Sequence, residues 1–162
     1  MQYSLDNDMI THIVEQYSDM LMRIAYQYTH SMEESKDIMQ DTFLALLDKR
    51  IFLSEEHIKH WLIRVVINKS KNYLKSAARK TVPLDETTLL FTPQERETIA
   101  ELDQLGDLDR NIIYLHYYEG YSLKEVSKIL KVTQNTVYIR MTRARQKLKN
   151  LIEDGEKNET DI

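Results

Sequence analysis

The chain has 162 residues, of which 42% are hydrophobic and 30% charged, as in a soluble protein of one domain or two small ones. With only 3 Gly and 2 Pro it has too few turn residues for an all-β fold, so an all-α fold is predicted. The absence of Cys excludes disulfides and thiolate metal sites, and it fits a cytoplasmic protein. No apolar run approaches the roughly 20 residues of a membrane helix, so no membrane insertion is expected.

The net charge of −4 is spread unevenly along the chain. Residues 1–58 carry eleven acidic and four basic side chains, whereas residues 59–80 carry seven basic side chains and no acidic one. Residues 131–149 hold six Lys or Arg and again no acidic residue. Because salt screens charges beyond roughly 8–10 Å, a phosphate backbone responds to these local blocks and not to the net charge. The two basic blocks therefore predict two nucleic-acid contacts on one chain.

Two amphipathic helices are predicted before the first basic block. Apolar residues recur at spacings of three and four over residues 8–29, with Asp8 as the expected N-cap. The next helix, about residues 33–49, contains SKDIMQDTFLALLDK and has Ser31 as its expected cap. Apolar residues on more than one of its sides fit a helix that packs inward and also meets a partner. The pattern alone favours the central helix of a small bundle.

Residues 50–60 are predicted to form a loop leading into a long helix over residues 58–79, with Ser54 as its cap. His57 and His60 lie three residues apart, a spacing that metal sites use. No further Cys or His cluster supports such a site, so neither a metal nor a cofactor is expected.

The long helix carries Asn68 and Asn72 in successive turns, with Lys69 between them. Asn is a poor helix former, so helix propensity would favour other residues there. Amides can hydrogen-bond base edges, and lysines can reach phosphates. A plain surface helix that tolerates two Asn explains the pattern equally well, so both interpretations stay open at this point.

Residues 80–97 hold both prolines and lack sustained periodicity, so they are predicted to be a flexible linker. The linker separates a helical domain over residues 1–79 from a second domain over residues 98–152. The Leu-Leu-Phe stretch at residues 89–91 is more apolar than a passive tether needs, and it is expected to dock on a surface. Residues 153–162 are predicted to be a frayed acidic tail.

The second domain is predicted to hold helices over residues 94–105 and 108–118, followed by two helices joined by a tight turn. Ser122 and Glu125 form a capping box, and Thr133 can cap the last helix after a three-residue turn. The last helix has one apolar face and otherwise basic or amide side chains. This is the layout of a DNA-reading helix-turn-helix, and the alternative is a helical hairpin with a solvated basic face.

Several motifs in sequence order resemble the bacterial RNA polymerase sigma factors of the extracytoplasmic-function type. DIMQDTFLALL at residues 37–47 is similar to that family's D-L-V-Q-E-T-F-L-R-L-W segment. Phe52, Ile58 and Trp61-Leu62 fall where the family has F, F and W-L. Residues 108–148 resemble the family's last domain, with its E-G-x-S-x-x-E-I-A and T-V-x-x-R-x-x-R-A-R-x-x-L patterns. The resemblance covers roughly residues 9–152 and implies two helical domains, of the region 2 and region 4 types.

The resemblance implies roles for particular residues. Asp37, Gln40, Asp41 and Phe43 would bind a coiled coil on the clamp of the polymerase's largest subunit. The loop of residues 51–60 would hold a base flipped out of the minus-ten element, and the last helix would read the minus-thirty-five element. The linker would run through the polymerase cleft toward the RNA exit path. The expected DNA-binding residues are Trp61, Asn68, Lys69 and Asn72, and in the last helix Gln134, Asn135, Tyr138, Ile139, Arg140, Arg143 and Lys147.

The favoured function is therefore a sigma factor that directs core RNA polymerase to promoter DNA. An anti-sigma factor is a further expected partner, since members of the family are often held by one. Tyr138 and Ile139 stand where many members carry Arg and Ser, so base preference does not carry over. The alternative is a stand-alone helix-turn-helix regulator, which leaves the basic block of residues 59–80 unexplained. An enzyme is not expected, because the five His are scattered and no phosphate loop or nucleophile elbow is present.

Overall fold

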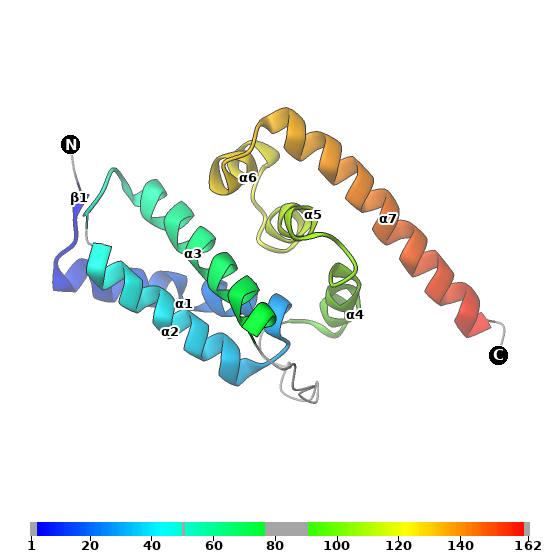
Figure 1. Cartoon of the computed structure of the whole chain (residues 1–162), viewed down its shortest axis with the longest axis horizontal. Helices are drawn as coiled ribbons and strands as arrows, with labels where there is room; N and C mark the ends of the chain where they lie inside the picture. The colour runs from blue at the N-terminus through cyan, green and yellow to red at the C-terminus, as the bar shows by residue number, and fades with distance from the viewer. Residues whose placement is uncertain (1–2, 50, 77–90, 161–162) are drawn as a thin grey trace. The chain divides into compact units, whose positions relative to one another are not determined.

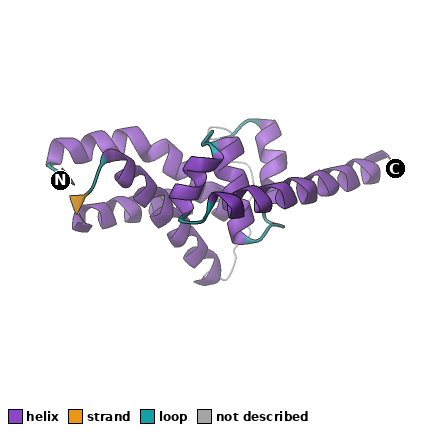
Figure 2. Cartoon of the chain, turned by 90° about the horizontal axis from the view of Figure 1, so that it is seen from above, coloured by secondary structure: helices purple, strands orange, loops and turns teal. Residues whose placement is uncertain are grey.

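The computed structural model describes residues 3–49, 51–76 and 91–160 of the chain. Most of the predicted linker, including Leu89 and Leu90, lies outside these residues. The chain divides into two compact units, Met1–Thr92 and Pro93–Ile162. The all-α prediction is confirmed, since helices make up most of the described residues (Figure 2). Within the same residues, no helix combines the length and the apolar composition that a bilayer crossing requires.

The first unit is a bundle of three helices that all contact one another: α1 (Asn7–Thr29), α2 (Met32–Lys49) and α3 (Glu55–Ser76) (Figure 1). Each helix turns an apolar stripe inward, and the fully buried side chains come from all three. They include Leu21, Ile24, Leu46, Leu62 and Val66. The bundle leaves the opposite faces of α2 and α3 open to solvent.

Two helix starts differ from the sequence-based expectations. Asp6, not Asp8, caps α1, and its Oδ1 accepts a 2.8 Å hydrogen bond from the Met9 amide. Asp8 lies in the first turn, where its charge still suits the positive end of the helix. The predicted loop of residues 50–60 is too long, because α3 begins at Glu55. Ser54 ends the loop there by accepting from the His57 amide at 3.1 Å.

A short antiparallel ladder joins the N-terminal residues to the connection between α2 and α3. Strand β1 (Tyr3–Ser4) pairs with β2 (Ile51–Phe52), with Tyr3 opposite Phe52 and Ser4 opposite Ile51. The sequence pattern did not predict this ladder, because two-residue strands are too short to show a hydrophobic period.

The second unit contains α4 (Pro93–Leu102), α5 (Asp107–Ile113), the π-helical turn η2 (Tyr114–Tyr118), α6 (Leu123–Leu130) and α7 (Gln134–Thr160). The predicted helix-turn-helix is α6 and α7. Ser122 caps α6 by accepting from the Glu125 amide at 3.1 Å, and Thr133 accepts from the Thr136 amide at 3.2 Å. Lys131 makes the turn between the two helices with a φ of 56°. Helix α7 continues to Thr160, through most of the residues expected to form an acidic tail.

Candidate nucleic-acid and protein interfaces

One exposed stripe runs along α2. Asp37, Gln40 and Asp41 are all exposed, and their spacing of three and four places them on one face of the helix. Leu44 continues the same face one turn later and is 59% exposed. We call these four residues the α2 stripe. An exposed apolar side chain with polar groups around it matches the division of a protein-protein contact into an apolar centre and a polar rim.

The exposure of Phe43 and Leu44 differs from the sequence-based expectation. Phe43, which was expected to contact a partner, is half-buried at the side of α2. Leu44, which was assigned no role, is the exposed apolar residue of the stripe. The available signal was its position, four residues after Gln40 and three after Asp41, but the presence of apolar residues on several sides concealed it.

The connection between α2 and α3 presents two apolar side chains to solvent. Phe52 is fully buried, whereas its neighbours Ile51 and Leu53 are 50% and 72% exposed. The Leu53 amide donates to Nδ1 of His57 at 3.0 Å. That bond requires Nδ1 to be unprotonated, so His57 carries any single ring proton on Nε2. The connection therefore has a fixed inner anchor and an exposed apolar edge.

Trp61 belongs to an aromatic cluster at the start of α3. Its ring meets that of Phe52 edge-on, with the ring centroids 5.4 Å apart. The ammonium group of Lys49 lies 5.1 Å from the Phe52 centroid and 5.4 Å from the Trp61 centroid. Trp61 is thus half-buried and held by its neighbours, so only part of its ring is open to a ligand.

The solvent face of α3 brings together most of the residues expected to bind DNA in the first unit. Asn68 and Asn72 are exposed and lie one turn apart, and Lys75 is exposed one turn further on. Trp61 lies on the same side of the helix, while Lys69 is half-buried at its edge. Arg64 also lies on this side, where partial burial lowers the pKa of its guanidinium group. We call Asn68, Asn72 and Lys75 the α3 face.

The first two turns of α7 present an exposed face of the helix-turn-helix. Gln134, Asn135, Tyr138 and Ile139 are all exposed, and Tyr138 reaches 65%. Val137, Met141 and Ala144 on the other side are buried and hold α7 against the unit. The exposed turns therefore present amide, phenol and aliphatic groups, which can all reach base edges in a major groove.

The basic residues of α7 fall into two groups. Arg140 Nη1 donates to Asp109 Oδ1 at 3.2 Å, and Lys147 Nζ donates to the Gln104 carbonyl at 2.9 Å. Both side chains thus reach back to the part of the unit that supports α7, Arg140 to α5 and Lys147 to the turn between α4 and α5. Arg143 is exposed and lies between them in sequence, and no such bond joins it to the described part of the unit. Of these three basic side chains, Arg143 is therefore the one best placed to meet a ligand.

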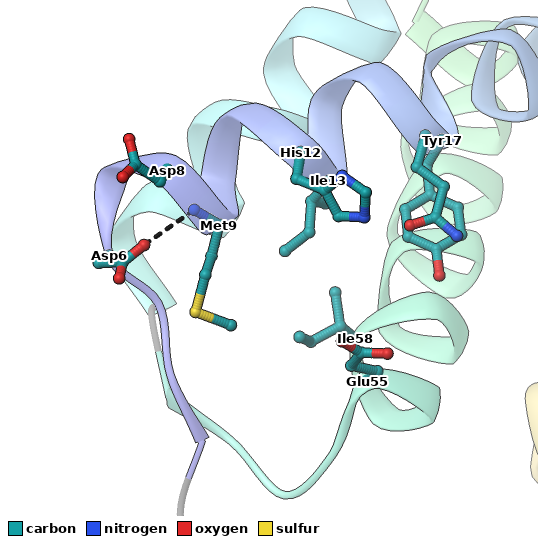
Figure 3. Close-up of a pocket in the computed structure, with 9 residues that line it drawn as sticks. Asp6, Asp8, Met9, His12, Ile13, Tyr17, Glu55 and Ile58 are labelled. Carbon is teal, nitrogen blue, oxygen red and sulfur yellow. Dashed lines mark hydrogen bonds between the residues drawn. The ribbon is translucent and has the colours of Figure 1, made fainter.

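A cavity of about 270 Å³ lies between the first turns of α1 and α3 (Figure 3). Met9, Ile13 and Ile58 line it with apolar groups, and Asp6, Asp8 and Glu55 add three carboxylates. Burial, and to a smaller extent the charge of Glu55, raises the pKa of the Tyr17 phenol at its edge. Carboxylates repel phosphate groups, so this cavity is not part of a nucleic-acid surface.

Comparison with known families finds similarity in both units. The model of Sigma-70 region 2 matches residues 13–80, and the model of Sigma-70 region 4 matches residues 95–148. These two ranges contain the α2 stripe, the α3 face and the exposed turns of α7.

Individual relatives and one solved structure are similar over most of the chain. ECF RNA polymerase sigma factor SigM of Mycobacterium tuberculosis is 30% identical over 139 residues, covering 82% of this chain and 71% of the relative. RNA polymerase sigma factor SigV of Bacillus subtilis is 25% identical over 143 residues, covering 84% and 86%. The structure of CnrH in complex with the cytosolic domain of CnrY matches with a TM-score of 0.69 and 24% identity. That match covers 92% of this chain and 90% of CnrH, and it shows a shared fold.

Proposed function

The chain belongs to the sigma factors of bacterial RNA polymerase, of the extracytoplasmic-function type, and we propose that its two units divide promoter recognition between them. The observation that carries the proposal is the presence of one exposed, carboxylate-free reading surface in each unit. The α3 face offers Asn68 and Asn72, and the start of α7 offers Gln134, Asn135 and Tyr138. Two weak DNA contacts on one chain gain avidity of about 10²–10⁴ when the second becomes intramolecular.

The α2 stripe is the proposed surface for core RNA polymerase. Asp37 and Asp41 give it negative charge, Gln40 gives it hydrogen-bonding capacity, and Leu44 gives it an apolar anchor. Fully desolvated apolar anchors contribute most of the binding energy at such contacts, while polar groups around them set register. Phe43 supports this surface from the side, because half of it packs against the bundle.

The α3 face and the connection of residues 51–54 are the proposed site for the minus-ten element. Opening a duplex and holding an unstacked base costs a few kcal/mol, which stacking and hydrogen bonds in a protein site must offset. Ile51 and Leu53 supply exposed apolar surface for contact with an unstacked base, and the Asn68 and Asn72 amides supply hydrogen bonds. Lys69 and Lys75 lie close enough along the helix to meet phosphates.

The start of α7 is the proposed reader of the minus-thirty-five element. Gln134, Asn135, Tyr138 and Ile139 would face base edges, and Arg143 would contact a base edge or a phosphate. Arg140 and Lys147 would act mainly through their bonds to Asp109 and Gln104, which set the direction of α7.

Three further statements belong to the same proposal. The protein works in the cytoplasm, where core polymerase and promoter DNA are found. It has no catalytic reaction of its own, since polymerase performs the chemistry. An anti-sigma factor is proposed to control its access to polymerase. Two similar solved structures support this: CnrH in complex with the cytosolic domain of CnrY, and the sigma factor RpoE of Bartonella quintana in complex with the anti-sigma factor NepR.

The first experiment is co-elution of the purified protein with bacterial core RNA polymerase on a sizing column, followed by promoter selection. The wild-type protein is expected to co-elute, and the resulting holoenzyme is expected to enrich two-part promoter sequences from a random DNA pool. A protein that ignores core polymerase from its own species, but protects a palindromic site as a dimer, would instead be a stand-alone regulator.

A further inference from the structure

We propose that the N-terminal strand β1 positions the connection of residues 51–54 for minus-ten recognition. The proposal rests on the function proposed above for that connection, and it adds a positioning segment to the site. Figure 1 shows β1 beside the connection that leads into α3. The two strands of the ladder are anchored in different ways.

Strand β2, which belongs to the connection, is anchored through Phe52. Its buried ring meets the rings of His57 and Trp61 edge-on, with centroid distances of 5.3 and 5.4 Å. The His57 ring also accepts a hydrogen bond from the Leu53 amide, at 3.0 Å. Side chains alternate along an extended strand, so an inward Phe52 places Ile51 and Leu53 outward. These contacts hold the middle and the end of the connection but leave its beginning, at Ile51, to other partners.

Strand β1 is anchored by the two residues that follow it, Leu5 and Asp6. Leu5 is 3% exposed and belongs to the core of the bundle. Asp6 caps α1 through its bond to the Met9 amide at 2.8 Å. The backbone of residues 3 and 4 is therefore held in place by its attachment to the start of α1. Ser4 lies opposite Ile51 in the ladder.

The ladder is the element that fixes the direction of Ile51. Pairing uses main-chain groups, so it restrains the backbone of the connection whatever side chains β1 carries. A one-residue slip would exchange the inward and outward positions of Ile51 and Phe52. By holding the register, β1 keeps both exposed apolar side chains in place before DNA arrives. A preformed site avoids part of the entropy cost of ordering a loop on binding.

The test compares two double variants at the same positions. Tyr3→Pro/Ser4→Pro removes both main-chain donors of β1 and breaks the ladder, whereas Tyr3→Val/Ser4→Thr keeps them. Each is measured as free protein by hydrogen exchange. The Leu53 amide, which His57 holds, is the internal control, and the amides of Ile51 and Phe52 report on the ladder. Each is also assembled with core RNA polymerase and tested on a promoter selected by the wild-type holoenzyme, with core affinity and minus-ten strand opening measured separately.

The proline variant is expected to exchange the Ile51 and Phe52 amides about tenfold faster and to open the minus-ten element roughly five- to tenfold less well. Its affinity for core polymerase and for the minus-thirty-five half is expected to stay within about twofold, and the Val/Thr variant should match wild type throughout. If the proline variant does not fold, deletion of residues 1–4 is tested in its place, since it keeps Leu5 and the Asp6 cap.

Unchanged exchange at residues 51 and 52 in the variant without a ladder would overturn the proposal. Faster exchange with normal minus-ten opening would also overturn it, since the ladder would then have no role in reading. An equal loss of core binding and promoter opening would point to general damage and count against it. If the wild-type holoenzyme selects no promoter at all, the proposed function fails, and the exchange experiment still decides whether β1 holds the connection.

Discussion

Phe91 packs its ring against Tyr26, with the ring centroids 5.8 Å apart and the ring planes tilted by 41°. Both side chains are buried, at 5% and 2% exposure. The last of the three apolar residues at 89–91 is thus docked on α1, as expected for that stretch, and the first unit extends to Thr92. Phe91 and Thr92, which fall within the residues 80–97 assigned to the linker, thus belong to the first unit.

Replacing Phe91 by Ala should destabilise the first unit. Removing a buried aromatic ring costs about 3–5 kcal/mol, and a ring near the edge of the bundle should lie at the low end of that range. The chain has a single Trp, and Trp61 lies in α3, so its fluorescence during urea unfolding reports on this unit. Leu44→Ala is the matched control, because it removes apolar atoms from an exposed site and should change stability by less than about 0.5 kcal/mol. Equal midpoints for the two variants would rule out the docking role of Phe91.

Leu44→Ala should weaken binding to core RNA polymerase by roughly tenfold or more, without a loss of folding stability. The reason is that truncating an apolar anchor at the centre of an interface commonly costs 1–2 kcal/mol or more. Phe43→Ala should weaken both binding and stability, because Phe43 is half-buried. Leu53→Ala removes a similarly exposed side chain from the minus-ten surface and should leave core affinity unchanged. A normal core affinity for Leu44→Ala would remove Leu44 from the polymerase surface.

Asn68→Ala should relax discrimination between minus-ten sequences while core affinity stays the same. An amide that reads a base edge contributes about 1–3 kcal/mol of discrimination. Lys75→Ala is the comparison on the same face, and it should weaken all sequences alike and reduce the salt dependence of binding by about one unit of slope. The measurement is holoenzyme binding to forked promoter DNA with each minus-ten base varied, at two or more salt concentrations. A loss that is the same for every sequence would assign Asn68 to the phosphate backbone.

Arg143 and Arg140 should behave differently although they lie three residues apart. Arg143→Ala removes an exposed basic group with no partner in the described unit, and it should cost about 1–3 kcal/mol of minus-thirty-five binding if it contacts a base edge. Arg140→Ala removes the ion pair with Asp109, and a surface ion pair contributes only about 0–1 kcal/mol. Asp109→Asn removes the same ion pair, so it should reproduce most of the effect of Arg140→Ala. Fluorescence anisotropy with duplex minus-thirty-five DNA and holoenzyme measures both. Equal losses at the two arginines, with Asp109→Asn silent, would place Arg140 on DNA.

The elements with a clear period were predictable, and the contacts between distant residues were not. The helices of residues 7–29 and 32–49 follow from apolar spacing, and the helix-turn-helix follows from Ser122 and Thr133, whose caps are present. The β1–β2 ladder and the Tyr26–Phe91 contact join segments whose pairing no local pattern records. Leu44 was missed because a helix with apolar residues on several sides does not reveal which side faces water until its neighbours are packed.

The stability of the first unit should fall at high pH because of Tyr17. Burial, and then the charge of Glu55, raises the pKa of the Tyr17 phenol above 10.0, so the folded state holds this proton more tightly than the unfolded state does. Below pH 10.0 the phenol is protonated in both states, and its contribution to stability is fully present. As the pH rises from there through the folded pKa, the unfolded state ionises first and that contribution is lost.

Tyr17→Phe should therefore show a smaller loss of stability than wild type between pH 9 and pH 11, since the pH window begins at the ordinary phenol pKa of about 10. The measurement is the urea midpoint followed by Trp61 fluorescence, which reports on the unit that holds Tyr17. The loss of stability of Glu55→Gln over this pH range should fall between those of wild type and Tyr17→Phe, because this substitution removes only the smaller of the two causes of the raised Tyr17 pKa. Tyr138→Phe removes a phenol from the other unit, whose unfolding Trp61 does not report, and it should follow the wild-type curve. Parallel curves for wild type and Tyr17→Phe would mean that the Tyr17 proton is equally held in the folded and unfolded chains.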